Sequence, residues 1–396
     1  MPSTTILITD GEQRAALAVV RSLGRAGYRV DVCSTRGRSL AGASRHARCE
    51  FAVPDPLHEP SHFAEAVAGH CRDRAVDVLL PIAEPALLAL LQARDSLAPV
   101  RIPFPSLGRF RAISDKEALT EAAARLGIRV PEQRVLHAPA EAERQMDSFR
   151  FPLVLKPARS VGEAGGQRLK VGVRYAMDPG ALRRELSQLP AQAFPLLLQQ
   201  RVVGPGVGIF LLRWQGRRVA TFAHRRLREK PPSGGVSVYR ESIPADPALV
   251  ELSEALLAAF DWDGVAMVEY KIEEATGTPY LMEVNGRFWG SLQLAVDAGV
   301  DFPRLLVECA LGREPRPCSE YRSGVRSRWW WGDFDHLLAR MRRSADALAL
   351  PPGAPGRGRV LRDFLTLWKP GDHSEVFRFA DPVPALRESI DWLRRR

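Results

Sequence analysis

The stretch YLMEVNGR, residues 280–287, is typical of a β-strand that carries polar groups on one face. Strand side chains point alternately to the two faces of a sheet, so Glu283 and Asn285 share one face while Met282 and Val284 share the other. A carboxylate and an amide oxygen side by side are ligands that suit Mg²⁺. Arg287 follows two residues later and adds a fixed positive fork for a phosphate group.

A second strand of the same kind lies upstream. Residues 265–271, VAMVEYK, also alternate and place Glu269 and Lys271 on one face. The alternative is a half-buried sheet with ordinary solvated charges on its outer face. Because two such strands each offer a carboxylate from an otherwise apolar run, we interpret the pair as a magnesium–nucleotide site.

Lysine usage points to two further residues. The chain has only six lysines among 56 basic residues, so a retained lysine suggests that a compact ammonium is needed. Lys156 ends the apolar run 151–155 and precedes the small, glycine-rich segment 158–166, whose backbone N–H groups could approach a phosphate closely. Lys116 stands at the start of a predicted helix, behind the capping candidates Ser114 and Asp115. For either lysine alone, a solvated surface position is the alternative.

Taken in order, these residues resemble the ATP-grasp superfamily, and within it the carboxylate–amine ligase-like branch. The resemblance covers about residues 105–312. It implies that Lys116 and Lys156 hold the phosphates of ATP and that magnesium ions are held by Glu269, Glu283 and Asn285. It also implies a hinge strand that binds adenine, with the nucleotide-binding residues Gln199, Gln200, Arg201 and Val202.

The resemblance has one departure near the hinge. Members usually carry an acidic residue at or shortly after the hinge to bind ribose, but residues 199–212 contain no carboxylate. We therefore expect Gln200 to take over the ribose contact. Downstream, residues 224–235 read as a basic and then Pro/Gly-rich loop that closes over the reacting group. In it, Arg226 and Arg228 would stabilise the substrate carboxylate, while Arg287 would stabilise the transferred phosphoryl group.

The predicted fold class is α/β, in three parts. Residues 1–104 form a Rossmann-like parallel sheet, the pre-ATP-grasp domain, which opens with a βαβ unit but has no GxGxxG and so no dinucleotide site. Residues 105–312 form a two-lobed α+β ATP-grasp domain with a lid subdomain at about 150–203. Residues 313–396 form a small C-terminal extension, in which the arginine- and tryptophan-rich segment 326–334 is predicted to be a strand packed on the core.

Bulk properties narrow the location and the partners. Five cysteines without a CxxC pair, and no long apolar run, favour a reducing, cytoplasmic setting. The net charge is +10, but the basic residues are scattered among acidic ones, so no nucleic-acid partner is expected. Contact with an anionic membrane surface and formation of a homodimer are both compatible with the sequence.

The predicted function is an ADP-forming carboxylate–amine ligase that uses ATP and Mg²⁺ on small-molecule substrates and passes through an acyl phosphate. One alternative is a bicarbonate-activating carboxylase, although the chain has no Met-Lys-Met carboxyl-acceptor signature. A second is a non-catalytic nucleotide-binding module, and a third is a nucleic-acid or membrane binder led by the basic C-terminal residues. No Ser-His-Asp or Cys-His arrangement and no histidine metal spacing is discernible.

Overall fold

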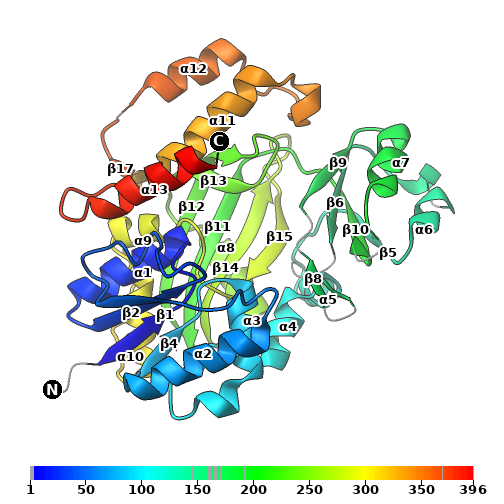
Figure 1. Ribbon diagram of the computed structural model, residues 1–396. Helices are drawn as coiled ribbons and strands as arrows, with labels where there is room; N and C mark the ends of the chain where they lie inside the picture. The colour runs from blue at the N-terminus through cyan, green and yellow to red at the C-terminus, as the bar shows by residue number, and fades with distance from the viewer. Residues whose placement is uncertain are drawn as a thin grey trace.

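The structure is a computed structural model that describes residues 4–144, 146–157, 162–164, 167–169, 172–190, 193–367 and 369–395. Its strands form two four-stranded sheets, one seven-stranded sheet and a two-stranded hairpin. Figure 1 shows the N-terminal sheet beside one end of the large central sheet, with a smaller lobe projecting on the far side. Among the described residues, no helix is long and apolar enough to span a membrane.

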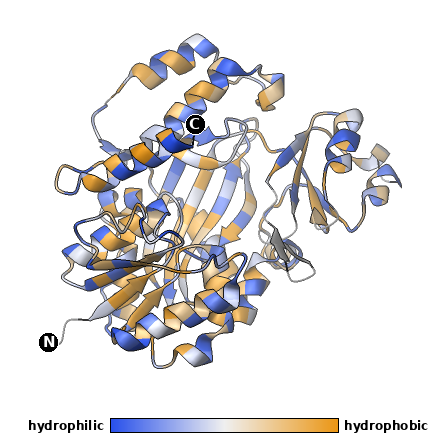
Figure 2. Cartoon of the chain, in the orientation of Figure 1, coloured by the Kyte–Doolittle hydropathy of each residue, from blue (hydrophilic) through white to orange (hydrophobic). Residues whose placement is uncertain are grey.

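The N-terminal part is a parallel sheet with helices packed on it. Its strand order is β3-β2-β1-β4, and β1 is buried along its whole length, as apolar strands covered on both faces are. Figure 2 shows these strands as predominantly apolar. The predicted Rossmann-like arrangement is confirmed. The elements are β1 (Thr5–Ile8), α1 (Arg14–Arg25), β2 (Arg29–Ser34), β3 (Cys49–Ala52), α2 (Pro60–Asp73), β4 (Val78–Leu80), α3 (Glu84–Gln92) and the short helix η1 (Arg94–Leu97).

Two short helices, α4 (Leu107–Ser114) and α5 (Lys116–Arg125), lead away from this domain. Asp115 separates them, and its carboxylate accepts hydrogen bonds from the backbone N–H groups of Glu117 and Ala118. Asp115 is therefore the helix cap, which places Lys116 at the first position of α5.

The projecting lobe is a second sheet with its own apolar core, in the antiparallel order β5-β10-β6-β9. The lid was predicted at about 150–203, but the sheet begins earlier, because β5 pairs with the hinge strand β10 along its whole length. That pairing joins residues far apart in sequence, which no local pattern reveals. The elements are β5 (Gln133–Leu136), α6 (Pro139–Arg144), η2 (Met146–Ser148), β6 (Leu153–Pro157), β7 (Gly162–Ala164), β8 (Gln167–Leu169), β9 (Arg174–Ala176), α7 (Pro179–Ser187) and β10 (Leu196–Gln200).

The central sheet has the order β15-β14-β11-β12-β13-β16-β17. Strands β11 and β12 form a hairpin that turns at Gln215 and Gly216, and both residues have positive φ, as a tight hairpin turn requires. The predicted loop 224–235 is wrong up to residue 230, because β12 continues through it and pairs with β13, with register shifts on either side of Arg228. Only residues 231–235 form a turn. The strands are β11 (Gly206–Trp214), β12 (Arg217–Lys230), β13 (Val236–Ser242), β14 (Gly264–Ile272), β15 (Pro279–Asn285), β16 (Arg326–Arg328) and β17 (Asp372–Ser374).

The C-terminal extension is joined to this sheet, since β16 pairs with β13 and β17 pairs with β16. The predicted strand at 326–334 covers only β16, and a helix begins at Trp330. The domain boundaries at 104 and 312 stay predictions. The remaining helices are α8 (Pro247–Ala259), α9 (Leu292–Ala298), α10 (Phe302–Ala310), α11 (Trp330–Arg342), η4 (Asp346–Leu348), α12 (Arg357–Leu365) and α13 (Val383–Arg394).

Candidate functional site

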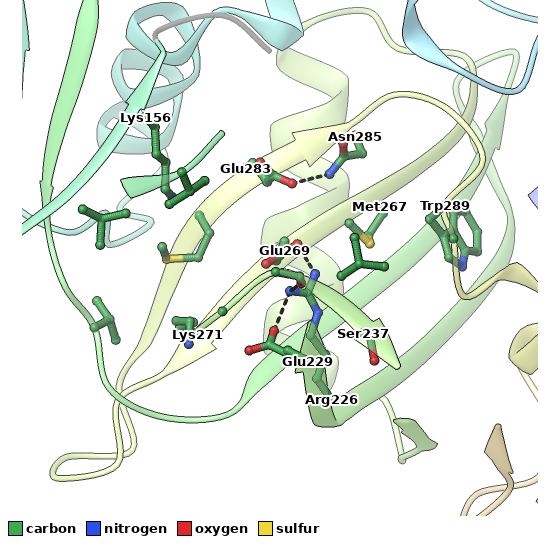
Figure 3. Close-up of a pocket in the computed structure, with 18 of the residues that line it drawn as sticks. Lys156, Arg226, Glu229, Ser237, Met267, Glu269, Lys271, Glu283, Asn285 and Trp289 are labelled. Carbon is green, nitrogen blue, oxygen red and sulfur yellow. Dashed lines mark hydrogen bonds and ion pairs between the residues drawn. The ribbon is translucent and has the colours of Figure 1, made fainter. Parts of the chain in front are cut away.

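The two predicted carboxylates are cross-strand neighbours that line one cavity. On the paired strands β14 and β15, Glu269 stands directly opposite Glu283. Both side chains, together with Asn285, line a cavity of 440 Å³ between the lid and the central sheet (Figure 3). The Asn285 amide donates a 2.7 Å hydrogen bond to Glu283 Oε1. The structure thus brings together three hard oxygen donors, the set that Mg²⁺ prefers.

Two lysines reach the same cavity from other elements. Lys156 comes from β6 in the lid and Lys116 from the start of α5, and both line the cavity. The Lys156 ammonium donates a 2.9 Å hydrogen bond to Gln199 Oε1 on the hinge strand. Burial lowers the pKa of Lys156, and it lowers the pKa of Lys116 to about 8 although Glu283 opposes the change. Two partly buried ammonium groups facing carboxylates are expected where phosphates bind.

The carboxylates themselves are unequal in environment. Burial raises the pKa of Glu269, against the opposing charge of Arg226. Burial alone would also raise the pKa of Glu283. The charge of Lys156 and the hydrogen bond from Asn285 outweigh burial and bring that pKa below its usual range. Adjacent buried carboxylates repel one another when both are ionised, and a divalent cation removes that cost. The donor set therefore fits a magnesium ion.

The three predicted arginines do not all reach the cavity. Arg226 lines it and forms ion pairs with Glu269 and, at 2.9 Å, with Glu229. Arg287 also lines it, and its Nη2 donates to Asn285 Oδ1 at 3.3 Å.

Arg228 is held elsewhere. Two 2.6 Å hydrogen bonds tie its guanidinium to Asp333 of α11, and it lies 4.5 Å from the centre of the Tyr239 ring. It is not among the residues that line the cavity. The predicted role of Arg228 at the reacting group is therefore corrected, because Asp333 fixes it against the C-terminal extension.

The hinge residues divide between two faces of β10. Gln199 faces the site through its hydrogen bond to Lys156, and Arg201 and Val202, just beyond the strand, line the cavity. Gln200 points the other way and lines a small separate hollow with Phe149. Strand alternation makes this unavoidable once Gln199 faces inward. The expectation that Gln200 binds ribose is therefore corrected.

Part of the cavity wall is not indicated by any pattern in the sequence. It is formed by His224, Trp289 and Ser291, which are almost fully buried. His224 Nε2 lies 2.8 Å from Ser291 Oγ, and burial together with the charge of Arg226 holds the pKa of His224 well below its usual value. Its imidazole is therefore neutral. These three residue types are common in ordinary cores, so no local pattern could have singled them out.

The turn 231–235 touches the lid at the cavity's rim. The Tyr175 hydroxyl donates a 3.0 Å hydrogen bond to the carbonyl oxygen of Ser233, and Arg201 Nη2 donates to the same oxygen at 3.3 Å. A side chain at Gly234 would meet the Tyr175 hydroxyl at 2.8 Å, and its φ of +135° also requires glycine. Lid and central sheet thus meet at this turn.

The paired carboxylates, the two lysines and the lid over the central sheet form the arrangement that the resemblance to ATP-grasp proteins implies. Residues 192–331 match the model of a family described as "ATP-grasp in the biosynthetic pathway with Ter operon". A curated relative is the carbamoyl phosphate synthase large chain of Rubrobacter xylanophilus, with 27% identity over 178 residues. That match spans 42% of this chain but only 16% of the relative.

Solved structures share the fold at low sequence identity. The L-amino acid ligase of Bacillus licheniformis is 18% identical with a TM-score of 0.62, covering 79% of this chain and 75% of that one. The N5-carboxyaminoimidazole synthetase of Staphylococcus aureus, solved with ADP, is 14% identical with a TM-score of 0.64, covering 82% and 80%. The biotin carboxylase of Campylobacter jejuni is 15% identical with a TM-score of 0.64, covering 82% and 74%.

The position of Lys116 leads to a pH prediction. Because its pKa in the free protein is about 8, its charge is present below that pH and lost above it. We expect nucleotide affinity to fall as the pH rises from 7 to 9, and binding near pH 8 to take up a proton as phosphate restores the ammonium. Calorimetry in buffers of different ionisation enthalpy measures that uptake. A Lys116→Ala variant should lose it, and uptake that persists in the variant would assign the proton to another group.

Proposed function

We propose that the protein is an ATP-dependent carboxylate–amine ligase that releases ADP and phosphate. The observation that carries the proposal is the pairing of Glu269 with Glu283, which line one cavity together with the ammonium groups of Lys116 and Lys156. The ATP-grasp fold agrees with it. The buried His224–Ser291 pair lines the same cavity and is available for a substrate beside the nucleotide.

The proposed reaction has two steps. An oxygen of the substrate carboxylate attacks the γ-phosphorus of ATP, the bond from that phosphorus to the bridging oxygen breaks, and ADP leaves. The amine nitrogen then attacks the acyl carbon of the acyl phosphate, loses a proton and expels phosphate. Such phosphoryl transfer depends mainly on positioning and on neutralising charge.

Each side chain has a proposed role in that chemistry. Lys156 and Lys116 hold the phosphates, and Arg201 and Val202 border the nucleotide at the hinge. Glu269, Glu283 and Asn285 would hold magnesium, which supplies positive charge to the phosphates when it is bound. Arg287 stabilises the transferred group, and Arg226 leaves its ion pair with Glu269 to receive the substrate carboxylate. His224 and Ser291 line the substrate end. A cytoplasmic location stays a prediction.

The test is an ADP-release screen of carboxylate and amine pairs, followed by mass detection of the product. Release that requires both substrates, with a product mass equal to their sum minus water, supports the ligase. Release that requires bicarbonate, with a carboxylated product, favours the carboxylase. Nucleotide binding without release under any pair contradicts both.

The two strand arginines give a sharp comparison. We expect Arg226→Ala to keep nucleotide binding but to lose product formation by about 100-fold or more, as removal of one charge-stabilising donor does. Arg228→Ala should keep turnover at the same temperature, because its guanidinium is bound to Asp333 outside the cavity. The Arg228→Ala variant should instead have a lower melting temperature, because the buried Asp333 carboxylate loses its hydrogen bonds to Arg228.

Steady-state turnover and thermal melting on the same preparations separate the two outcomes. If Arg228→Ala loses turnover while Arg226→Ala keeps it, the assignment of the two residues is reversed.

A further inference from the structure

The C-terminal helix α13 carries its apolar residues on the outside. Its solvent face presents Val383, Leu386, Ile390 and Leu393, which are 54%, 63%, 37% and 63% exposed. Figure 1 shows α13 on the outer side of the molecule, away from the lid. A surface helix ordinarily turns its apolar stripe to the core.

The polar side of α13 is the one that faces the protein. Glu388 Oε1 accepts a 2.8 Å hydrogen bond from Trp329, and Ser389 Oγ accepts one of 3.0 Å from Trp331. The Trp392 ring stacks on Trp331 with centroids 4.2 Å apart. These contacts fix the rotation of the helix, so it cannot turn to bury the stripe without losing all three.

The spacing of the stripe selects one kind of partner. Its four residues are three, four and three positions apart, which is the spacing of the a and d positions in a coiled coil. Such a stripe is narrow and can be covered by a single opposing helix. The spacing is also the same read in either direction. An identical helix laid antiparallel across a two-fold axis would therefore set Val383 against Leu393 and Leu386 against Ile390 at both ends of the seam.

We propose that α13 is the dimer seam of this protein, paired antiparallel with α13 of a second copy. The seam positions are uncharged, and the adjacent Arg387 is already neutralised by Asp391 of its own helix at 3.2 Å. A surface-bound membrane helix would instead present basic side chains to lipid headgroups along its whole polar face, but here Ser389 and Trp392 contact α11, and the exposed Arg394 and Arg395 stand only at the end of the helix.

The area that the seam buries determines how tightly the dimer is expected to associate. A helix of 12 residues is about 18 Å long, so the seam alone covers less than the roughly 800 Å² per partner of a standard interface. Phe377 and Phe379, 40% and 93% exposed, precede the helix and extend the apolar surface. The dimer should therefore be reversible and depend on protein concentration.

The first experiment is sedimentation of the full chain over a roughly hundredfold range of concentration. The wild type should pass from monomer to dimer, and Leu386→Glu should remain monomeric throughout. Leu365→Glu is the matched control, because Leu365 is 61% exposed on α12, outside the seam. Equal melting temperatures at a concentration where the wild type is monomeric would show that both variants are folded. A wild type that stays monomeric, or a Leu365→Glu variant that alone loses the dimer, overturns the proposal.

A second experiment tests the orientation. A mixture of Leu386→Cys and Ile390→Cys copies should form a disulfide-linked dimer faster than either variant alone. Faster linkage of Leu386→Cys to itself would mean parallel helices and overturn the antiparallel seam. Anionic vesicles give the remaining outcome: if monomeric wild type binds them and Leu386→Glu does not, the stripe is a lipid contact and the dimer proposal fails.

Discussion

A Lys156→Ala variant is expected to lose ATP-dependent turnover by about 100-fold or more, on the scale of losing one preorganised charge donor. The reason is its position. The ammonium is buried in the cavity, attracted to Glu283 and held by Gln199 on the hinge. Among the described residues of the lid, Lys156 is the only lysine that lines the cavity. Nucleotide affinity should fall in the same variant, which isothermal calorimetry measures without knowledge of the substrates.

Two further variants test whether the effect of Lys156→Ala is specific to the ammonium at this position. Lys369→Ala removes an exposed lysine from the C-terminal extension and should behave as wild type. Lys156→Arg keeps the charge but should still lose most activity, because the guanidinium is larger and fork-shaped in a packed site. Equal loss in Lys369→Ala and Lys156→Ala, or full activity in Lys156→Arg, would contradict a phosphate contact at this position.

Much of the site could be predicted because strand periodicity is local. The alternation around Glu283 and around Glu269 places each carboxylate on one face, and the structure pairs the two residues directly. The same holds for Lys116, whose helix cap is formed by its immediate neighbour. The positions of these residues could be predicted because a short stretch of sequence determines the local geometry.

The failures concern contacts between distant residues. Arg228 was expected in a loop because proline and glycine follow it, but pairing with β13 extends the strand and Asp333, 105 residues away, captures the guanidinium. Gln200 was expected to face the nucleotide because it lies on the hinge. Which of two adjacent glutamines faces inward depends on how β10 sits between β5 and β6, which a single strand cannot specify.

The prediction that the glycine-rich segment binds phosphate is not tested by the structure. Residues 158–161, 165 and 166 of the glycine-rich segment lie outside the described residues, as does Lys170. The expectation that this backbone approaches a phosphate therefore stays a prediction.

The variant Glu283→Gln should abolish the magnesium-dependent part of ATP stabilisation. A ligand that binds only the folded state adds about 2.7 kcal/mol at a concentration 100-fold above its dissociation constant, which appears as a higher melting temperature. The amide keeps the size of the carboxylate but not its charge. Glu274→Gln, on the exposed turn after β14, is the matched control and should show the full shift.

ATP binding in the absence of magnesium distinguishes the loss of a metal ligand from damage to the fold. Glu283 is an anion facing the two lysines, so it repels metal-free ATP as much as it attracts a cation. Removing its charge should therefore leave metal-free ATP binding unchanged or stronger, while the gain on adding magnesium disappears. A variant that merely damaged the fold would lose both. If Glu283→Gln keeps the full magnesium-dependent shift, Glu283 is not a metal ligand, and the paired carboxylates have another role.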